Sequence, residues 1–130
     1  MSHESKINMV IKDKGSLIKA CERLGLEFHE GQKTYRSYSQ GRCNHAISMP
    51  NGKGYEIGVR EEENGEMSLH WDSYGGAQGM SEMVGGSECG KLKQFYGLEA
   101  AKVAARKKGV NAYEKVKEDG SIDLTIEVQE

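Results

Sequence analysis

The sequence has little proline, few aromatic side chains and no long hydrophobic run. It contains one proline, and aromatic residues make up 7% of the chain. No apolar stretch approaches the roughly 18 residues that a transmembrane helix needs, so we expect no membrane span. The hydrophobic share of 36% lies below the usual globular range, which predicts a modest core and long polar loops.

An excess of charge of one sign is also missing. The formal net charge is −2, which provides neither the basic field of a nucleic-acid coat protein nor the acidic surplus of a disordered tail. The three cysteines are Cys21, Cys43 and Cys89, an odd number far apart, and without a charged-then-apolar stretch we expect no secretory leader. We therefore expect a soluble protein of a reducing compartment, cytoplasmic in location.

A length of 130 residues fits one domain over residues 1–130. The chain has 17 glycines, and they are dense between residues 73 and 90. Glycine in a regular element costs about 1 kcal/mol relative to alanine, so this stretch is predicted to be a mobile surface loop.

The first elements follow from the spacing of apolar residues. Residues 6–12 alternate like a half-buried strand, and residues 16–24 show helical spacing. Asp13 or Ser16 can cap that helix, and Gly25 can end it. Residues 26–29 start an extended piece, and residues 30–44 form either a strand or a long loop.

Three further strands and a second helix follow. Residues 46–49 and 55–59 form a predicted hairpin, and residues 67–72 form a third antiparallel strand. Helical spacing returns over residues 91–108, and residues 113–128 read as a second hairpin that turns at Asp119-Gly120.

The predicted fold is a two-layer α+β domain in the order β-α-β-β-β-α-β-β. Its mostly antiparallel sheet carries both helices on one face. The expected core is apolar and comes from every element: Ile7, Met9, Ile11, Leu17, Leu24, Ile57, Val59, Leu69, Leu92, Tyr96, Val103, Ile122, Leu124 and Ile126.

Residues 85–92 have the glycine and lysine spacing of a phosphate-binding loop before a helix. Leu92 stands where a Ser or Thr hydroxyl would hold magnesium, and the preceding residues make a poor buried strand. A flexible loop before an ordinary helix start is the favoured interpretation.

A metal site is an alternative. Cys43, His45 and His70 are candidate zinc ligands, with His29 and Cys89 chemically capable as well. Only Cys43-x-His45 forms a close pair, whereas structural zinc sites usually present two such pairs. A small zinc-binding protein or enzyme that uses Cys43, His45 and His70 stays open as a hypothesis.

Residues 33–42 alternate aromatic and basic side chains, as do surfaces that stack bases and neutralise phosphates. Single-stranded nucleic-acid binding is therefore a second alternative. The structural interpretation, an edge strand with its tyrosines turned inward, is favoured over it.

Several short motifs together resemble the uncharacterised family of hypothetical chloroplast reading frame 35, also catalogued as domain of unknown function 1257. The resemblance implies a small α+β protein of plastids, cyanobacteria and phages, in some genomes encoded near an AAA-type ATPase. It implies no activity or catalytic residue, and the glycine-rich segment of residues 75–90 departs from it. The motifs are Ser2-His3-Glu4-Ser5-Lys6-Ile7, Asp13-x-x-x-Leu17, Leu24-Gly25-Leu26, Tyr55-Glu56-Ile57-Gly58-Val59-Arg60, Trp71-Asp72-x-x-Gly75, Leu92-x-Gln94-x-Tyr96 and Asp119-Gly120-Ser121-Ile122-Asp123-Leu124.

We expect a binding or adaptor protein without catalytic activity or cofactor. It would recognise a macromolecular partner through the exposed sheet face and the glycine-rich loop, because mobile loops on a rigid sheet commonly form recognition sites. The partner would be a protein or a second copy, with an AAA-type ATPase implied by the resemblance. Compartments in keeping with the resemblance are the plastid stroma and the cytoplasm of an infected host. The expected contacts are Tyr35, Tyr38, Arg42, His70, Trp71, Tyr74 and Lys91.

Overall fold

The computed structural model describes residues 4–38, 40–73 and 79–127. Its main element is a five-stranded sheet in the order β1-β7-β6-β5-β2, in which all neighbours are antiparallel. The strands are β1 (Glu4–Lys6), β2 (Glu27–Glu30), β5 (His45–Ser48), β6 (Ile57–Glu61) and β7 (Met67–Asp72). The expected α+β fold with a mostly antiparallel sheet is confirmed.

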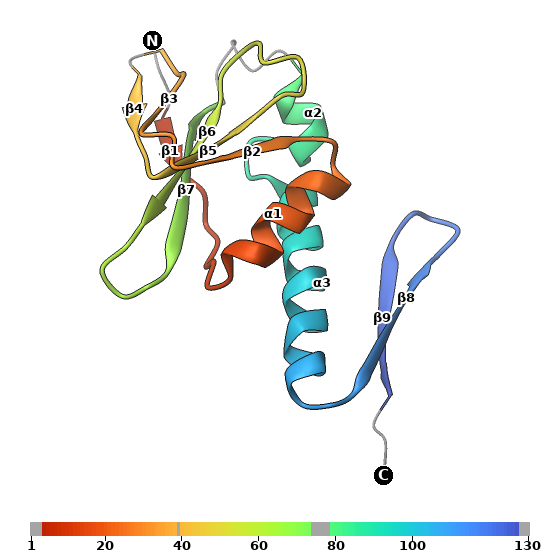
Figure 1. Ribbon diagram of the computed structural model, residues 1–130. Helices are drawn as coiled ribbons and strands as arrows, with labels where there is room; N and C mark the ends of the chain where they lie inside the picture. Colours follow the sequence, from red (N-terminus) through yellow and green to blue (C-terminus); the bar gives the residue numbers. More distant parts are fainter. Residues whose placement is uncertain (1–3, 39, 74–78, 128–130) are drawn as a thin grey trace.

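Three helices lie on one side of this sheet (Figure 1): α1 (Lys14–Arg23), α2 (Met80–Val84) and α3 (Gly90–Lys107). Asp13 begins α1 as predicted, since its carboxylate accepts a hydrogen bond from the backbone N–H of Gly15 at 3.2 Å. Gly25 follows the end of α1 with a φ of 78°, the left-handed conformation that glycine adopts without strain.

The main core lies between the sheet and the helices. The largest side chains that it buries completely include Trp71 and Met80. Its members from the sheet side and the helix side are Ile7, Ile11, Leu26, Ile47, Ile57, Val59, Met67, Leu69, Trp71, Leu17, Ala20, Cys21, Met80, Val84, Cys89, Leu92 and Tyr96.

The opposite face of the sheet is covered in part by a small hairpin, β3 (Thr34–Tyr35) and β4 (Gly41–Arg42). Tyr35 forms a second cluster there with Cys43 and Ala46. The segment of residues 30–44, for which strand and loop were both open, therefore contains two short strands that pair with each other.

The second predicted hairpin is present as β8 (Asn111–Val116) and β9 (Ile122–Glu127). These strands pair with each other and not with the five-stranded sheet. Figure 1 shows the hairpin standing beside α3, apart from the sheet.

Three sequence predictions about the fold need correction. The first strand ends at Lys6, and residues 7–11 continue as irregular chain with one bridge from Ile11 to Met67. The glycine-rich stretch is a loop only in part, because α2 lies within it and buries Met80 and Val84.

The third correction concerns the core. Ile122 and Leu124 are only half-buried and Ile126 is 51% exposed, because their hairpin is not part of the sheet. Val103 is half-buried as well, outside the main core cluster. Within the described residues, no helix is long and apolar enough to span a bilayer.

Candidate functional site

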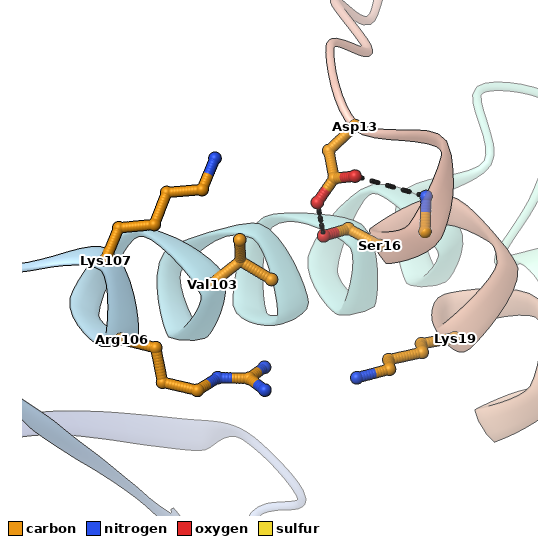
Figure 2. A pocket seen from close by; sticks show the side chains of 7 residues that line it. Asp13, Ser16, Lys19, Val103, Arg106 and Lys107 are labelled. Carbon is orange, nitrogen blue, oxygen red and sulfur yellow. Dashed lines mark hydrogen bonds between the residues drawn. The ribbon is translucent and has the colours of Figure 1, made fainter.

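A surface concavity lies where the start of α1 meets the end of α3. A hollow of about 420 Å³ is lined there by seven residues (Figure 2): Asp13, Gly15, Ser16, Lys19, Val103, Arg106 and Lys107. A second hollow of about 430 Å³ adjoins it and shares Asp13, Val103 and Lys107 with it. Its other lining residues are Val10, Lys12, Tyr96, Ala100 and Ala104. We call the two together the cationic groove.

The groove has an apolar floor and charged walls. Val103 lies between the two basic residues of α3, and Figure 2 shows Lys19 and Arg106 extended toward each other from the two helices. The floor continues through Ala100 to Val10, whose side chain is 60% exposed at the rim. Apolar contact and positive charge are therefore offered together.

Four cations of the groove have no partner in the described part of the chain. The side chains of Lys12, Lys19, Arg106 and Lys107 form no ion pair and no hydrogen bond with any described residue. Elsewhere on the same helices Lys14, Arg23 and Lys102 are paired with glutamates. The groove thus combines positive charge with open space.

The one carboxylate in the groove is already engaged. Asp13 accepts hydrogen bonds from the hydroxyl of Ser16 at 2.6 Å and from the N–H of Gly15 at 3.2 Å (Figure 2). It caps α1 and forms no ion pair with the described cations around it, and its single negative charge is outnumbered by their four positive charges. An added anion would therefore meet a net positive surface.

Tyr96 holds the segment before α1 against α3, the two parts of the chain that form the groove. Its hydroxyl, on α3, accepts hydrogen bonds from the backbone N–H groups of Lys12 at 2.9 Å and Asp13 at 3.2 Å. At the other end of α1, Arg23 lies over the Phe95 ring, 4.5 Å from its centroid, and pairs with Glu99 at 3.5 Å. Both ends of α1 are therefore held against the same part of α3, around residues 95–99.

The residues expected to contact a partner are dispersed. Tyr38 is 68% exposed, and Arg42 is exposed on the same small hairpin, whereas Lys91 is exposed at the start of α3. His70 is half-buried on β7, and Tyr74 lies outside the described residues.

Tyr35 and Trp71 were expected to contact a partner at the surface, but the structure buries both side chains. The Tyr35 ring lies over Gly58 on the sheet face opposite the helices. Trp71 belongs to the main core, and its indole N–H donates to the carbonyl of Ser87 at 3.0 Å.

The candidate zinc ligands are each engaged separately. The Cys43 thiol donates to the carbonyl of Gln32 at 3.1 Å, and burial raises the pKa of that thiol. His45 accepts from the N–H of Gly31 through Nδ1 at 3.0 Å, which leaves Nε2 to donate to Glu61 at 2.7 Å.

His70 Nε2 lies 2.9 Å from the Ser68 hydroxyl, which itself donates to Glu62. No group of three or more His, Cys, Asp and Glu side chains among the described residues is arranged to hold a metal ion.

The segment with the spacing of a phosphate-binding loop, residues 85–92, does not have the strand before it that such a loop follows. It connects α2 to α3, not a strand to a helix. Cys89, at the start of α3, is fully buried, and burial raises its pKa to about 12.

Sequence reasoning missed the cationic groove because it joins residues about 90 positions apart. Arg106 and Lys107 had an adequate local explanation, since cations suit the C-terminal end of a helix. The available signal was the apolar residues one turn before them on the same helix, Ala100, Val103 and Ala104, of which only Ala104 is fully exposed.

A family model described as "Protein of unknown function (DUF1257)" matches residues 20–125. No curated protein and no solved structure matches the chain.

Proposed function

Since the chain belongs to the DUF1257 family of proteins of unknown function, whose description assigns no activity, we propose from its geometry that it is a binding or adaptor protein whose cationic groove takes an acidic, partly apolar protein segment. The observation that carries this proposal is a set of four cations around an apolar floor, Lys12, Lys19, Arg106 and Lys107, whose side chains have no partner among the described residues. An AAA-type ATPase is one such partner that the resemblance suggests.

The chemistry of the groove favours a protein ligand over single-stranded nucleic acid. Non-specific binding of single strands relies on aromatic rings that stack with bases. The one aromatic residue of the groove is Tyr96, whose side chain is buried and whose hydroxyl is occupied. Aliphatic side chains flanked by carboxylates fit Val103 and the surrounding cations better.

A titration tests the proposal. The probe is a fluorescent peptide of alternating leucine and glutamate, added to wild-type protein and to the Lys19→Glu/Arg106→Glu variant. Reversal of two wall charges is expected to weaken binding by about 10-fold or more, because like charges then face each other. Lys108→Glu is the matched control, as Lys108 follows α3 but does not line the groove.

Two results would overturn the proposal. One is equal affinity of the peptide for wild type and the groove variant. The other is a clear preference for a twelve-nucleotide thymidine strand over the peptide, which would favour the nucleic-acid alternative.

A further inference from the structure

Positive charge is not spread evenly along the cationic groove. Its hollow of about 420 Å³, which we call the first hollow, is lined by the cations Lys19, Arg106 and Lys107 and by the carboxylate of Asp13. Three cations against one carboxylate give the first hollow a formal charge of +2. In the adjoining hollow, Lys12 and Lys107 against Asp13 give a formal charge of +1. The first hollow is therefore the part of the groove that attracts an anion most strongly.

Two of these cations converge within the first hollow. Figure 2 shows the guanidinium of Arg106, from α3, and the ammonium group of Lys19, from α1, extended toward each other, with Lys107 on the other side of Val103. Neither side chain forms an ion pair or a hydrogen bond with a described residue. Because like charges that face each other repel, an anion between them removes a repulsion and adds two attractions.

On its other side, Arg106 borders a smaller hollow of about 250 Å³ next to β8. Lys102 also lines that hollow, but it is paired with Glu99 at 2.8 Å and with Glu114 at 3.1 Å. Its charge is therefore already balanced. An anion that binds Arg106 is drawn instead to the α1 side, where Lys19 has no partner among the described residues.

A phosphate monoester fits this position better than carboxylates do. Its charge of about −2 at pH 7 matches the first hollow in one compact group, whereas two carboxylates at the same point repel each other. Its oxygens accept two hydrogen bonds from a guanidinium and further ones from an ammonium group. Next to it, Val103, Ala100 and Ala104 offer an apolar surface to the residues that flank the phosphate.

Resting on the proposed function of the groove, we infer that the acidic segment it takes is a phosphorylated one. A phosphoserine or phosphothreonine of the partner protein lies between Lys19 and Arg106, and its phosphoryl group connects α1 to α3. An apolar neighbour in the same segment lies over Val103, and a flanking carboxylate meets Lys12. Phosphorylation of the partner therefore decides how tightly this chain holds it.

Three fluorescent peptides test this inference by anisotropy titration with the full chain. They share one leucine–glutamate sequence and differ only at the central position, which is phosphoserine, serine or glutamate. At pH 7 the phosphoserine peptide is expected to bind about 10-fold or more tightly than the serine peptide, because charge-assisted hydrogen bonds are strong. The glutamate peptide should lie between them. Below about pH 6 the preference for phosphoserine should shrink, since the phosphate then takes up its second proton.

A pair of variants locates the preference. Lys19→Gln/Arg106→Gln is expected to bind the phosphoserine and serine peptides with affinities within about two-fold of each other. Lys12→Gln/Lys108→Gln is the matched control, because it removes the same charge outside the first hollow. The control should bind both peptides somewhat more weakly than wild type and keep the preference for phosphoserine. Circular dichroism checks that both variants retain their helices.

Equal affinity of wild type for the phosphoserine and serine peptides overturns the inference, as does a preference that Lys19→Gln/Arg106→Gln retains. In either case, binding of the serine peptide leaves the proposed function standing. If none of the three peptides binds, both are wrong. Inorganic phosphate alone is the last probe, measured by calorimetry. If it binds as tightly as the phosphoserine peptide, the hollow is a site for a free phosphate compound and the inference is wrong.

Discussion

At the scale of single residues, two glycines determine where the largest side chain of the outer sheet face can lie. The ring of Tyr35 occupies the space that a Cβ would take at Gly41 on β4 and at Gly58 on β6. Because the two glycines lie on a hairpin and on the main sheet, the tyrosine joins these two pieces of structure.

We expect Gly58→Ala to destabilise the protein by about 1 to 3 kcal/mol, because the added methyl collides with a ring that is 1% exposed and cannot move away. Urea denaturation followed by circular dichroism measures the effect. Gly97→Ala is the matched control, since Gly97 lies in α3 with open space around it, and there the alanine should stabilise the fold by about 0.5 to 1 kcal/mol. Equal stability of wild type and Gly58→Ala would contradict this account.

At the scale of elements, an ionic network connects α1, α3 and β8. Glu99 is almost buried and pairs with Lys102 at 2.8 Å and with Arg23 at 3.5 Å. Glu114 of β8 bridges the same two cations. The network is the principal polar link between the helices and the hairpin, so it decides how firmly the hairpin is held.

The attachment of the hairpin should depend on pH through Glu114. Burial raises the pKa of this carboxyl, but hydrogen bonds from Arg23 and Lys102 and their charges outweigh that effect and leave the pKa below the ordinary 4.5. A carboxyl with a lowered pKa stabilises the folded arrangement above that ordinary value, and the contribution is lost as the pH falls through the folded pKa.

Glu114→Gln should therefore loosen the hairpin at pH 7, and the difference from wild type should shrink as the pH falls below 4.5 through the lowered pKa of Glu114. Because the network is partly exposed, we expect a loss of about 1 kcal/mol, or roughly five-fold faster amide exchange in β8 and β9. Hydrogen exchange with mass spectrometry measures it. Asp123→Asn is the control, since the Asp123–Lys117 pair is exposed and lies within the hairpin; a similar change there would show that the helix contacts are not responsible.

At the scale of the whole molecule, all three thiols are shielded by the fold. Cys21 and Cys89 are fully buried, and burial raises the pKa of each to about 12, while burial also raises the pKa of Cys43. At pH 8 only about one thiolate in ten thousand forms at a pKa of 12. These cysteines are therefore packing residues in the folded protein.

We therefore expect no rapid reaction of the native protein with Ellman's reagent at pH 8. In 6 M guanidinium three equivalents of thiol per chain should react. The expected reaction in native buffer is slow and should accelerate with urea in parallel with unfolding. A fast equivalent from native protein would show an accessible thiol, and the Cys43→Ser variant would identify whether Cys43 is its source.

The sequence predicts correctly those features of the fold that depend on residues close together in the chain. The alternation in residues 55–59 and 67–72 and the cap at Asp13 are local, and they lead to the correct elements. The burial of Met80 and Val84 depends on helices and strands distant in the chain, which outweigh the cost of the surrounding glycines. The groove depends on the meeting of α1 and α3, so composition and spacing could not reveal it.

The position of β1 at the edge of the sheet has a consequence for synthesis. Among the residues that the structure describes, its only strand partner is β7, with Glu4 opposite Asp72 and Lys6 opposite His70. As a ribosome makes the chain from the amino end, residues 4–6 emerge long before residues 70–72 exist. Residues 4–6 must therefore wait, without this strand partner, until β7 has been made.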